Sequence, residues 1–417
     1  MRIRRDYYLN RLIGSRHNGL IKIITGIRRS GKSFLLFELF DEYLRQNGID
    51  DEHIIKVALD DRRYAPLRDP DAMIAYVDGK IVDSQRYYIL LDEVQMMSEF
   101  VDVLNSLLHI KNADVYVTGS NSKFLSSDVA TEFRGRGDEL HLFPLSFAEY
   151  YGAVGGDKAA RWREYYTFGG LPQLLVYDDE SKKADYLRNL YRSVYLKDII
   201  ERHHIKNSSE FEELLQMISS SVGAPCNPNK LSNTFRSVKG INIDNKTVSR
   251  YLKYMEDAFF IERSRRYDVK GKRYINTLSK YYFQDIGMRN ALLGFRQLEE
   301  SHIMENIIYN ELRLRGYAVD VGTTEIRTAN KRNETVRKQL EVDFVANKGY
   351  NRYYIQSALT LSSREKKEQE AAPFRQIADS FRKIFVVRDD IMPYFDDNGY
   401  LIIGLFDFLL STGMRWE

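Results

Sequence analysis

The 417-residue sequence has a single cysteine, no long apolar run and almost no net charge. The one cysteine, Cys226, excludes an internal disulfide framework and is typical of proteins in a reducing compartment. No stretch of about 18 apolar residues occurs, which excludes a membrane-spanning helix. The opening MRIRRDYYLNRL is charged too early for a secretory signal. We therefore expect a cytoplasmic protein that does not contact a membrane.

The composition is that of a folded protein with more than one domain. Hydrophobic residues make up 43% of the chain and aromatic residues 13%, which argues against bulk disorder. A chain of this length exceeds one ordinary core, so two or three domains are expected. A formal net charge of +3 gives no global reason to expect nucleic acid, although basic clusters occur locally.

The segment GIRRSGKS, residues 26 to 33, fits the phosphate-loop pattern G-x-x-x-x-G-K-[ST]. The apolar run LIKIIT before it predicts a buried strand, and KSFLLFELFDEYLRQNG repeats apolar residues at helical spacing up to Gly48. Glycines let backbone N–H groups turn toward phosphates, and the helix start adds a favourable dipole. We expect Lys32 to contact the β and γ phosphates of ATP and Ser33 to bind Mg²⁺. The residues expected around the nucleotide are Gly26, Ile27, Arg28, Arg29, Ser30, Gly31, Lys32, Ser33 and Phe34.

A second motif, YYILLDEVQ, spans residues 87 to 95. Five apolar or aromatic residues followed by two carboxylates are typical of a buried parallel strand that ends where α/β sheets place their ligands. Asp92 can hold the metal through water, and Glu93 can orient or deprotonate the attacking water. The two motifs together predict a catalytic nucleotide site.

Polar residues after the next strand are further candidates. The run ADVYVTGSN, residues 113 to 121, ends in Ser120 and Asn121, and Asn121 is a candidate for holding the water. A plain strand-ending turn is the alternative. Arg134 and Arg136 flank a glycine before the strand ELHLF, and Arg136 is a candidate for reaching the γ-phosphate of a neighbouring copy. The alternative for both arginines is a solvated loop. The sequence therefore leaves open whether the protein forms a homo-oligomer.

The combination of GIRRSGKS, YYILLDEVQ, VTGSNSKFL, GRGDELHLFPLSFAEY and FGGLPQLL resembles prokaryotic AAA-type ATPases that carry a C-terminal DUF4143 domain. The later segments KYYFQDIGMRN, ENIIYNELRLRGY and EVDFVANKGYNRYYIQ resemble that C-terminal domain. The resemblance implies an α/β fold, with a parallel AAA-type P-loop sheet that contains an additional strand. It also implies a P-loop domain over residues 1–152, a helical lid over 153–206, a winged-helix segment over 207–275 and an α+β restriction-nuclease-like domain over 276–417.

The middle of the chain contains helices and many basic residues. Within the lid, Arg188 or Arg192 could reach phosphate, while the adjacent His203 and His204 are a poor metal pair. A helix, a turn near Gly240, a second helix and a basic β-ribbon then follow in the order of a winged helix-turn-helix. Contact with DNA and internal packing are equal alternatives for its polar and basic residues. These are Lys246, Ser249, Arg250, Lys253, Arg263, Arg265, Arg266, Lys270 and Lys272.

The last domain resembles a PD-(D/E)XK nuclease core, in which carboxylates hold Mg²⁺ and a lysine polarises water. On this interpretation Glu305, Asp343 and Gln356 occupy the ligand positions. The expected lysine is replaced by Ala358, although basic residues follow on the next helix at Arg364, Lys366 and Lys367. A degenerate fold without cutting activity is therefore preferred.

The sequence thus predicts an ATPase that uses ATP and Mg²⁺ to change the conformation of a C-terminal region in contact with DNA or a protein partner. Two alternatives stay open. One is a DNA-binding regulator or defence protein in which the nucleotide acts as a switch. The other is a metal-dependent nuclease gated by ATP, against which Ala358 argues.

Overall fold

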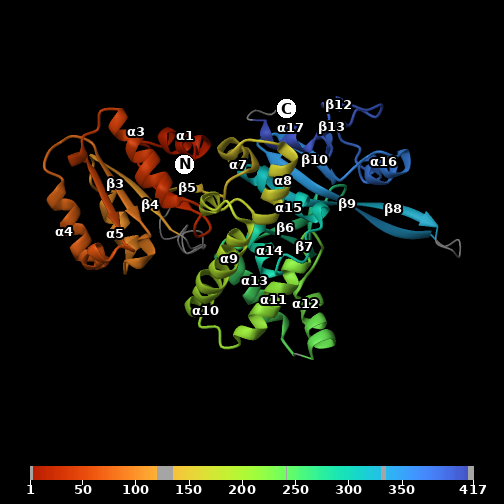
Figure 1. Ribbon diagram of the computed structural model, residues 1–417, viewed down its shortest axis with the longest axis horizontal. Helices are drawn as coiled ribbons and strands as arrows, with labels where there is room; N and C mark the ends of the chain where they lie inside the picture. Colours follow the sequence, from red (N-terminus) through yellow and green to blue (C-terminus); the bar gives the residue numbers. More distant parts are fainter. Residues whose placement is uncertain (1–2, 120–134, 241, 330–334, 412–417) are drawn as a thin grey trace. The chain divides into compact units, whose positions relative to one another are not determined.

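The computed structural model describes residues 3–119, 135–240, 242–329 and 335–411 (Figure 1). The chain divides into two compact units. The first comprises Met1–Pro144, Leu171–Gln173 and Glu256–Phe260, and the second comprises Leu145–Gly170, Leu174–Met255 and Ile261–Glu417. The finer division at residues 152, 206 and 275 stays a prediction.

A parallel sheet forms the centre of the first unit. Its strands are β1 (Ile21–Thr25), β2 (Ile54–Ala58), β3 (Tyr87–Asp92), β4 (Ala113–Thr118) and β5 (Gly137–His141). They lie in the order β2-β3-β4-β1-β5, and every neighbouring pair is parallel. β4 lies between β1 and β3, so it is the additional strand that the resemblance implies. The expected parallel P-loop sheet is confirmed.

Helices surround this sheet because apolar residues project from both of its faces. The helical segments are α1 (Asp6–Gly14), α2 (Lys32–Phe34), η1 (Leu35–Phe40), α3 (Asp41–Gln46), η2 (Asp51–His53), η3 (Arg62–Arg68), α4 (Pro70–Lys80), η4 (Val94–Met96) and α5 (Phe100–Leu107). α2, η1 and α3 are continuous and end before Gly48, whose φ of 80° suits glycine. Strand residues such as Ile23, Ile89 and Val117 pack against Met73 and Leu104 of α4 and α5. In the helix predicted after the phosphate loop, Leu35, Leu39, Phe40 and Leu44 are buried, so the apolar repeat there is a packed face.

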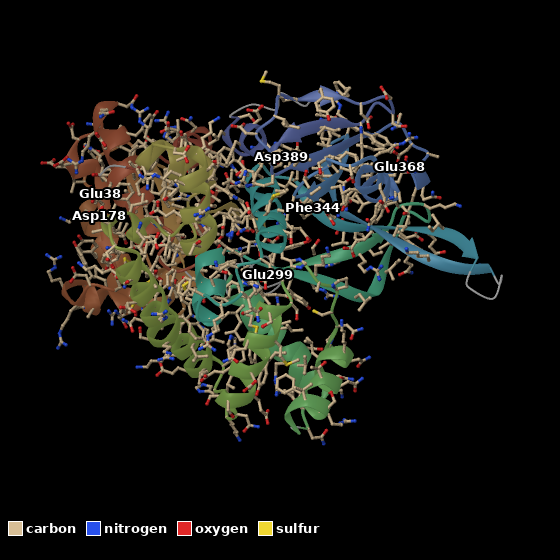
Figure 2. All side chains as sticks on the ribbon, turned by 45° about the vertical axis from the view of Figure 1, so that its right-hand side comes forward. Glu38, Asp178, Glu299, Phe344, Glu368 and Asp389 are labelled. Atoms are coloured by element: carbon tan, nitrogen blue, oxygen red, sulfur yellow. The ribbon has the colours of Figure 1, made fainter. Side chains whose placement is uncertain are left out.

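The second unit contains an eight-stranded mixed sheet in the order β12-β13-β11-β10-β9-β8-β6-β7. Its strands are β6 (Ile261–Asp268), β7 (Arg273–Phe283), β8 (Ala318–Ala329), β9 (Thr335–Lys348), β10 (Asn351–Ala358), β11 (Arg382–Val387), β12 (Tyr394–Phe395) and β13 (Leu401–Gly404). Phe344 on β9, labelled in Figure 2, is fully buried inside this unit. The sheet gives the unit its own core.

Helices account for most of the remaining residues of this unit. Before the sheet come α7 (Phe147–Val154), α8 (Lys158–Phe168), η6 (Pro172–Val176), α9 (Glu180–Leu190), η7 (Tyr191–Leu196), α10 (Lys197–Arg202), α11 (Ser208–Ser220), α12 (Pro228–Thr234), η8 (Phe235–Lys239) and α13 (Asn245–Asp257). The first two residues of η6 and the last two of α13 belong to the first unit. After β7 come α14 (Ile286–Leu292), α15 (Glu300–Leu314), α16 (Arg364–Ala371), η9 (Phe374–Gln376) and α17 (Leu405–Leu410). Among the described residues, no helix has the length and apolar character needed to cross a membrane.

The expected winged helix is not confirmed as a separate segment. The order of α12, α13 and the β6–β7 hairpin follows the prediction, but β6 also pairs in parallel with β8, where Arg266 faces Val321. The hairpin is thus part of the eight-stranded sheet, and a boundary at residue 275 would cut through β7. The local sequence pattern predicts the hairpin. It does not predict the pairing of β6 with β8, because that is a tertiary contact between residues 55 positions apart.

Two glycine motifs pack backbone against backbone in the second unit. Gly170 N–H donates to Asp285 Oδ2 at 2.8 Å, and the same carboxylate accepts from Met288 N–H at the start of α14. A Cβ atom on Gly169 would lie 2.5 Å from Asp285 Oδ1, and one on Gly287 would lie 1.8 Å from the carbonyl oxygen of Phe168. The FGG and QDIG motifs therefore contain glycine because no side chain fits between them.

Candidate nucleotide-binding site

The phosphate loop connects β1 to the helix that begins at Lys32. Gly26 has a φ of 140°, and a Cβ atom there would lie 2.2 Å from the carbonyl oxygen of Leu142, so only glycine fits. Gly31 has a φ of 98° and caps the start of α2. Both glycines are therefore required by the loop conformation that the sequence motif predicts.

Lys32 is buried inside this loop. Its side chain is 4% exposed, and Nζ donates to the carbonyl oxygens of Gly26 at 3.0 Å and Ile27 at 3.2 Å. Burial lowers the pKa of Lys32 to about 8, although the nearby charges of Glu93 and Asp92 raise it. The Ser30 hydroxyl is also buried and has no hydrogen-bond partner among the described residues. The loop thus holds a cation and a free donor in an enclosed place.

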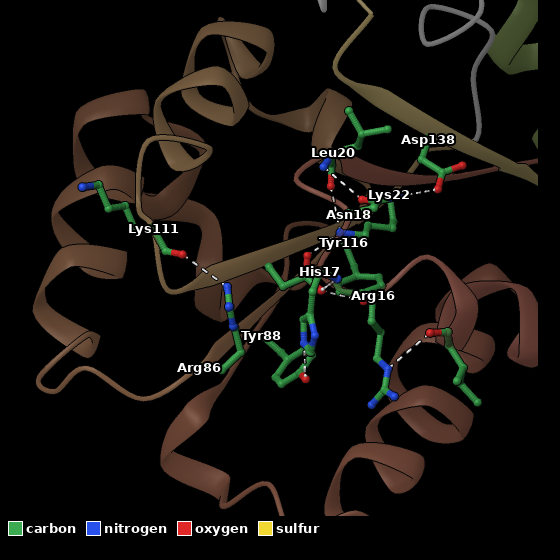
Figure 3. Close-up of polar contacts among 12 residues, drawn as sticks. Arg16, His17, Asn18, Leu20, Lys22, Arg86, Tyr88, Lys111, Tyr116 and Asp138 are labelled. Carbon is green, nitrogen blue, oxygen red and sulfur yellow. Dashed lines mark hydrogen bonds and ion pairs between the residues drawn. The ribbon is translucent and has the colours of Figure 1, made fainter.

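A second buried lysine in this unit, Lys22, differs from Lys32 because a carboxylate balances its charge. Lys22 of β1 forms an ion pair with Asp114 of β4, and Nζ also donates to the carbonyl oxygen of Leu20 at 2.9 Å (Figure 3). Tyr116 donates its hydroxyl hydrogen to the same carboxylate at 2.9 Å. Within the described ranges, Lys32 has no carboxylate at ion-pair distance, and the charges of Glu93 and Asp92 act on it from further away. A bound anion would stabilise this ammonium further.

Asp92 ends β3 directly beside the phosphate loop. Its side chain is 3% exposed and accepts hydrogen bonds from the hydroxyl groups of Thr118 and Ser33. Burial raises the pKa of Asp92, while these two hydrogen bonds lower it. The structure therefore brings together Ser33 and Asp92, the two predicted metal ligands.

Glu93 follows at the strand end with a left-handed backbone, at a φ of 53°. Its N–H donates to Thr118 Oγ1 at 3.1 Å, and its half-buried carboxylate accepts a hydrogen bond from the amide of Gln95. The left-handed conformation is uncommon for a residue other than glycine and is often found at functional sites. Glu93 is thus held at the edge of the site by Thr118 and Gln95.

Thr118 and Gln95 are site residues that the sequence analysis missed. Thr118 is fully buried at the end of β4, which lies next to β3 with Val117 opposite Leu91. A polar residue that closes an apolar strand was the available signal, whereas the sequence motif pointed to the residues just after it. Those residues, Ser120 and Asn121, lie outside the described part of the chain, as does Arg134.

The remaining predicted residues lie away from the phosphate loop or are open to solvent. Arg136 is exposed and directly precedes β5, and its carbonyl oxygen accepts from Ile21 N–H at the amino-terminal end of β1. The length of β1, roughly 16 Å, therefore separates Arg136 from its own phosphate loop, and a role toward a neighbouring copy stays a prediction. Arg29 and Phe34 are exposed, and Arg28 is half-buried.

A model of an AAA domain (AAA_14) matches residues 18–151, which include the whole site. A protein of Haemophilus influenzae described as uncharacterised is 33% identical over 390 residues, covering 92% of this chain and 93% of that protein. The chain belongs to the same family as this Haemophilus influenzae protein. The AAA-domain match and the geometry of Lys32, Ser33 and Asp92 identify a P-loop NTPase.

The expectation that this AAA-domain protein carries a DUF4143 domain is wrong. A domain of unknown function, DUF8612, matches residues 159–299 instead. This range contains the FGGLP and QDIGMRN segments on which the DUF4143 resemblance partly rested. The two glycine motifs are therefore features of this second matched region.

Other similar proteins are more distant. An uncharacterised protein of Methanocaldococcus jannaschii is 27% identical over 86% of this chain and 79% of its own length. The Aeropyrum pernix ORC1 protein, solved in complex with DNA, is 12% identical over 70% of this chain and 93% of that chain, with a TM-score of 0.29. Cdc6p of Pyrobaculum aerophilum is 12% identical over 72% and 92%, with a TM-score of 0.28. TM-scores this low do not establish a shared fold over those lengths.

Proposed function

We propose that this AAA-domain protein binds ATP with Mg²⁺, hydrolyses it, and thereby changes the conformation of a region that contacts DNA or a protein partner. The observation that carries the proposal is the buried ammonium of Lys32, whose contacts are two backbone carbonyl oxygens. A buried cation without a carboxylate at ion-pair distance is unfavourable, and a triphosphate would add negative charge to that of the more distant Glu93 and Asp92.

The residues of the loop have distinct roles in this proposal. Lys32 and the backbone N–H groups of the loop bind phosphate oxygens, and the unpaired Ser30 hydroxyl donates to another. Ser33 and Asp92 fit Mg²⁺ because both present oxygen atoms and already lie together. When bound, Mg²⁺ neutralises charge on the phosphates. Glu93 accepts the proton of the attacking water, and Thr118 holds both carboxylate-bearing residues in place.

The other predicted catalytic residues complete the proposed site. Asn121, which lies outside the described residues, is proposed to hold the water, and Arg136 of a neighbouring copy is proposed to reach the γ-phosphate. The second role requires a homo-oligomer. Measuring the mass of the protein with and without ATP by light scattering distinguishes this arrangement from a monomer with a solvated Arg136.

A short segment supports the proposed conformational change. Leu171–Gln173 belongs to the first unit, and Pro172 Cγ lies 3.8 Å from the point where a side chain on Gly31 would begin. The preceding Gly170 is bound by Asp285 at the start of α14 in the second unit. Each of these contacts lies within one unit, and the peptide bond between Gly170 and Leu171 joins the two segments.

Steady-state ATP hydrolysis by the full chain, with and without duplex DNA, tests the proposal. Hydrolysis that duplex DNA stimulates would support an ATPase coupled to DNA. Hydrolysis without a response to DNA would keep the ATPase and direct the search to protein partners. Bound ATP without hydrolysis would favour a nucleotide switch, and a protein that binds no ATP would refute the proposal.

Exposed cations on α13 favour DNA as the partner, and a charge reversal tests them. Lys246, Arg250 and Lys253 are all exposed, whereas Arg266 of the ribbon is buried against Gln339 and is not available. We expect Arg250→Glu to weaken DNA binding about tenfold at low salt, because phosphate contacts depend on charge. Fluorescence anisotropy over a salt series measures this effect. The same affinity and salt dependence in the variant and the wild type would contradict a DNA contact through α13.

Thr118 offers a test of the carboxylate geometry. We expect Thr118→Val to slow ATP hydrolysis about 10- to 100-fold, because the isosteric change removes the hydroxyl that bonds both Asp92 and the Glu93 backbone. Thr118→Ser keeps the hydroxyl and is the matched control, and thermal unfolding verifies that both variants fold. A wild-type rate in Thr118→Val would show that this hydroxyl does not position the carboxylates.

A further inference from the structure

Helix α15 is bound to the edge strand β7 by side chains that act as a neighbouring strand would. Phe283 N–H donates to Asn306 Oδ1 at 2.8 Å, and Asn306 Nδ2 donates back to the Phe283 carbonyl oxygen at 2.8 Å. Asn310 Nδ2 donates to the same carbonyl oxygen at 2.9 Å. Asn306 is fully buried. These bonds fix α15 on β7 and place Glu305 beside Lys280.

Lys280 is buried and lies among carboxylates, of which Glu305 and Asp343 are buried and Glu341 is about one-third exposed. The side chain of Lys280 is 2% exposed, and Nζ lies 2.8 Å from Glu305 Oε1 on α15 and 2.6 Å from Glu341 Oε1 on β9. Tyr282 donates its hydroxyl hydrogen to Glu305 Oε1 at 2.7 Å. One carboxylate from a helix and one from a strand, which are far apart in the sequence, therefore share the ammonium group of Lys280.

Asp343 completes the cluster from β9. Its Oδ2 accepts from Ser357 N–H at 2.8 Å, and its own N–H donates to Gln356 Oε1 at 3.4 Å. Burial raises the pKa of Asp343 well above its usual range, and the charge of Glu305 adds to this effect while Lys280 opposes it. Burial lowers the pKa of Lys280, but the carboxylates of Glu305, Asp343 and Glu341 outweigh burial and raise it. Lys280 therefore stays protonated at every physiological pH.

The surroundings of the cluster are aromatic. The rings of Tyr282 and Tyr309 stack at 4.2 Å between centroids, and Phe344 lies 6.1 Å from Tyr282. Tyr282, Tyr309 and Phe344 are each at most 1% exposed. An apolar shell of this kind strengthens the attraction between Lys280 and its carboxylates and makes loss of either partner costly.

These are the residues that the nuclease-like resemblance assigns to Mg²⁺. The chain order α15, β8, β9, β10 and α16 brings Glu305, Asp343 and Gln356 together, as the sequence predicts, and Ala358 stands at the lysine position of β10. The lysine comes from β7 instead and bonds the carboxylates directly. Within the described residues, no group of three or more His, Cys, Asp or Glu side chains is arranged to hold a metal ion. The cluster does not fit Mg²⁺.

We propose that Lys280 is the resident cation of this cluster in place of a divalent metal, so that Glu305, Glu341 and Asp343 form a metal-independent structural centre and not a nuclease site. Lys280 belongs to the region that matches DUF8612, whereas its carboxylate partners follow that region in the chain. The ammonium thus joins this region to the strands and helix that follow it.

Binding of Mn²⁺ to the full chain tests the proposal. Every protein carries Asp92→Asn, which removes the metal ligand of the phosphate loop, and no nucleotide is present, so the result is independent of ATP hydrolysis. With Lys280 in place we expect no saturable Mn²⁺ binding by calorimetry. We expect Lys280→Ala to lower the melting temperature by about 5–10 °C, to bind one Mn²⁺, and to regain part of its stability on binding. Lys280→Arg keeps the charge and should bind none.

Two results would overturn the proposal. One is Mn²⁺ binding, or plasmid cleavage, by protein with Lys280 intact that is lost on Asp343→Asn. The other is a folded Lys280→Ala protein that takes up no Mn²⁺, because the uncompensated carboxylates would then not form a cation site. If Lys280→Ala does not fold, the titration of the protein with Lys280 intact decides alone: no binding supports the proposal and binding lost on Asp343→Asn refutes it.

Discussion

Replacing Lys32 with alanine should abolish measurable ATP binding, with a loss of affinity of about 100-fold or more. The structural reason is that Lys32 is a buried ammonium held by the carbonyl oxygens of Gly26 and Ile27, with no carboxylate partner among the described residues. Alanine removes the positive charge that the phosphates are expected to meet. Isothermal calorimetry with ATP and Mg²⁺ on the full chain measures the effect.

The pH dependence of ATP binding is a second test of whether Lys32 binds the phosphates. Because the pKa of Lys32 is lowered to about 8 in the free protein, a growing fraction of the side chain is neutral above that pH. Bound phosphates favour the charged form and raise this pKa, so ATP affinity should fall as pH rises through 8. Lys32→Met fills the space without the charge, and its residual affinity should not change over this range. Wild-type affinity in either variant would refute the site.

The arrangement of Lys32, Ser33 and Asp92 could be predicted from sequence because these residues lie in short contiguous motifs. Lys32 and Ser33 follow the loop glycines, and Asp92 closes an apolar run, so each residue is placed by its own strand. Parallel strands end at one edge of a sheet, and this rule alone brings Asp92 to the loop. The hydrogen bond from Thr118 to Asp92 depends on β4 lying beside β3, which is a tertiary fact.

Contacts between distant segments account for what the sequence did not reveal. Lys280 meets Glu305 and Glu341 at sequence separations of 25 and 61 residues, and no local pattern signals such a meeting. The ribbon strand β6 pairs with β8 through a similar long-range contact. Arg136 lies at the amino-terminal end of β5, so its predicted role toward a neighbouring copy stays a prediction and does not concern its own phosphate loop. In each case tertiary packing decides the outcome over local pattern.

Replacing Glu93 with glutamine should preserve ATP binding and slow hydrolysis about 10²- to 10⁴-fold. Glutamine keeps the size of the side chain and can stay near Gln95, but it cannot accept a proton from water. The backbone bond from residue 93 to Thr118 is also unaffected by this change. Single-turnover hydrolysis, measured beside ATP affinity in the same protein, separates the two effects.

Glu99 provides a matched control for this change. It is a glutamate six residues further on with a similar left-handed backbone, at a φ of 49° against 53° for Glu93, but it occupies the N-cap position of α5 with an exposed side chain that makes no capping hydrogen bond. Glu99→Gln should therefore hydrolyse ATP at the wild-type rate. Equal rates in Glu93→Gln and Glu99→Gln would remove Glu93 from the chemistry. A slow Glu93→Gln protein that still binds ATP would instead assign proton transfer to this one carboxylate, because backbone conformation and residue type are the same at both positions.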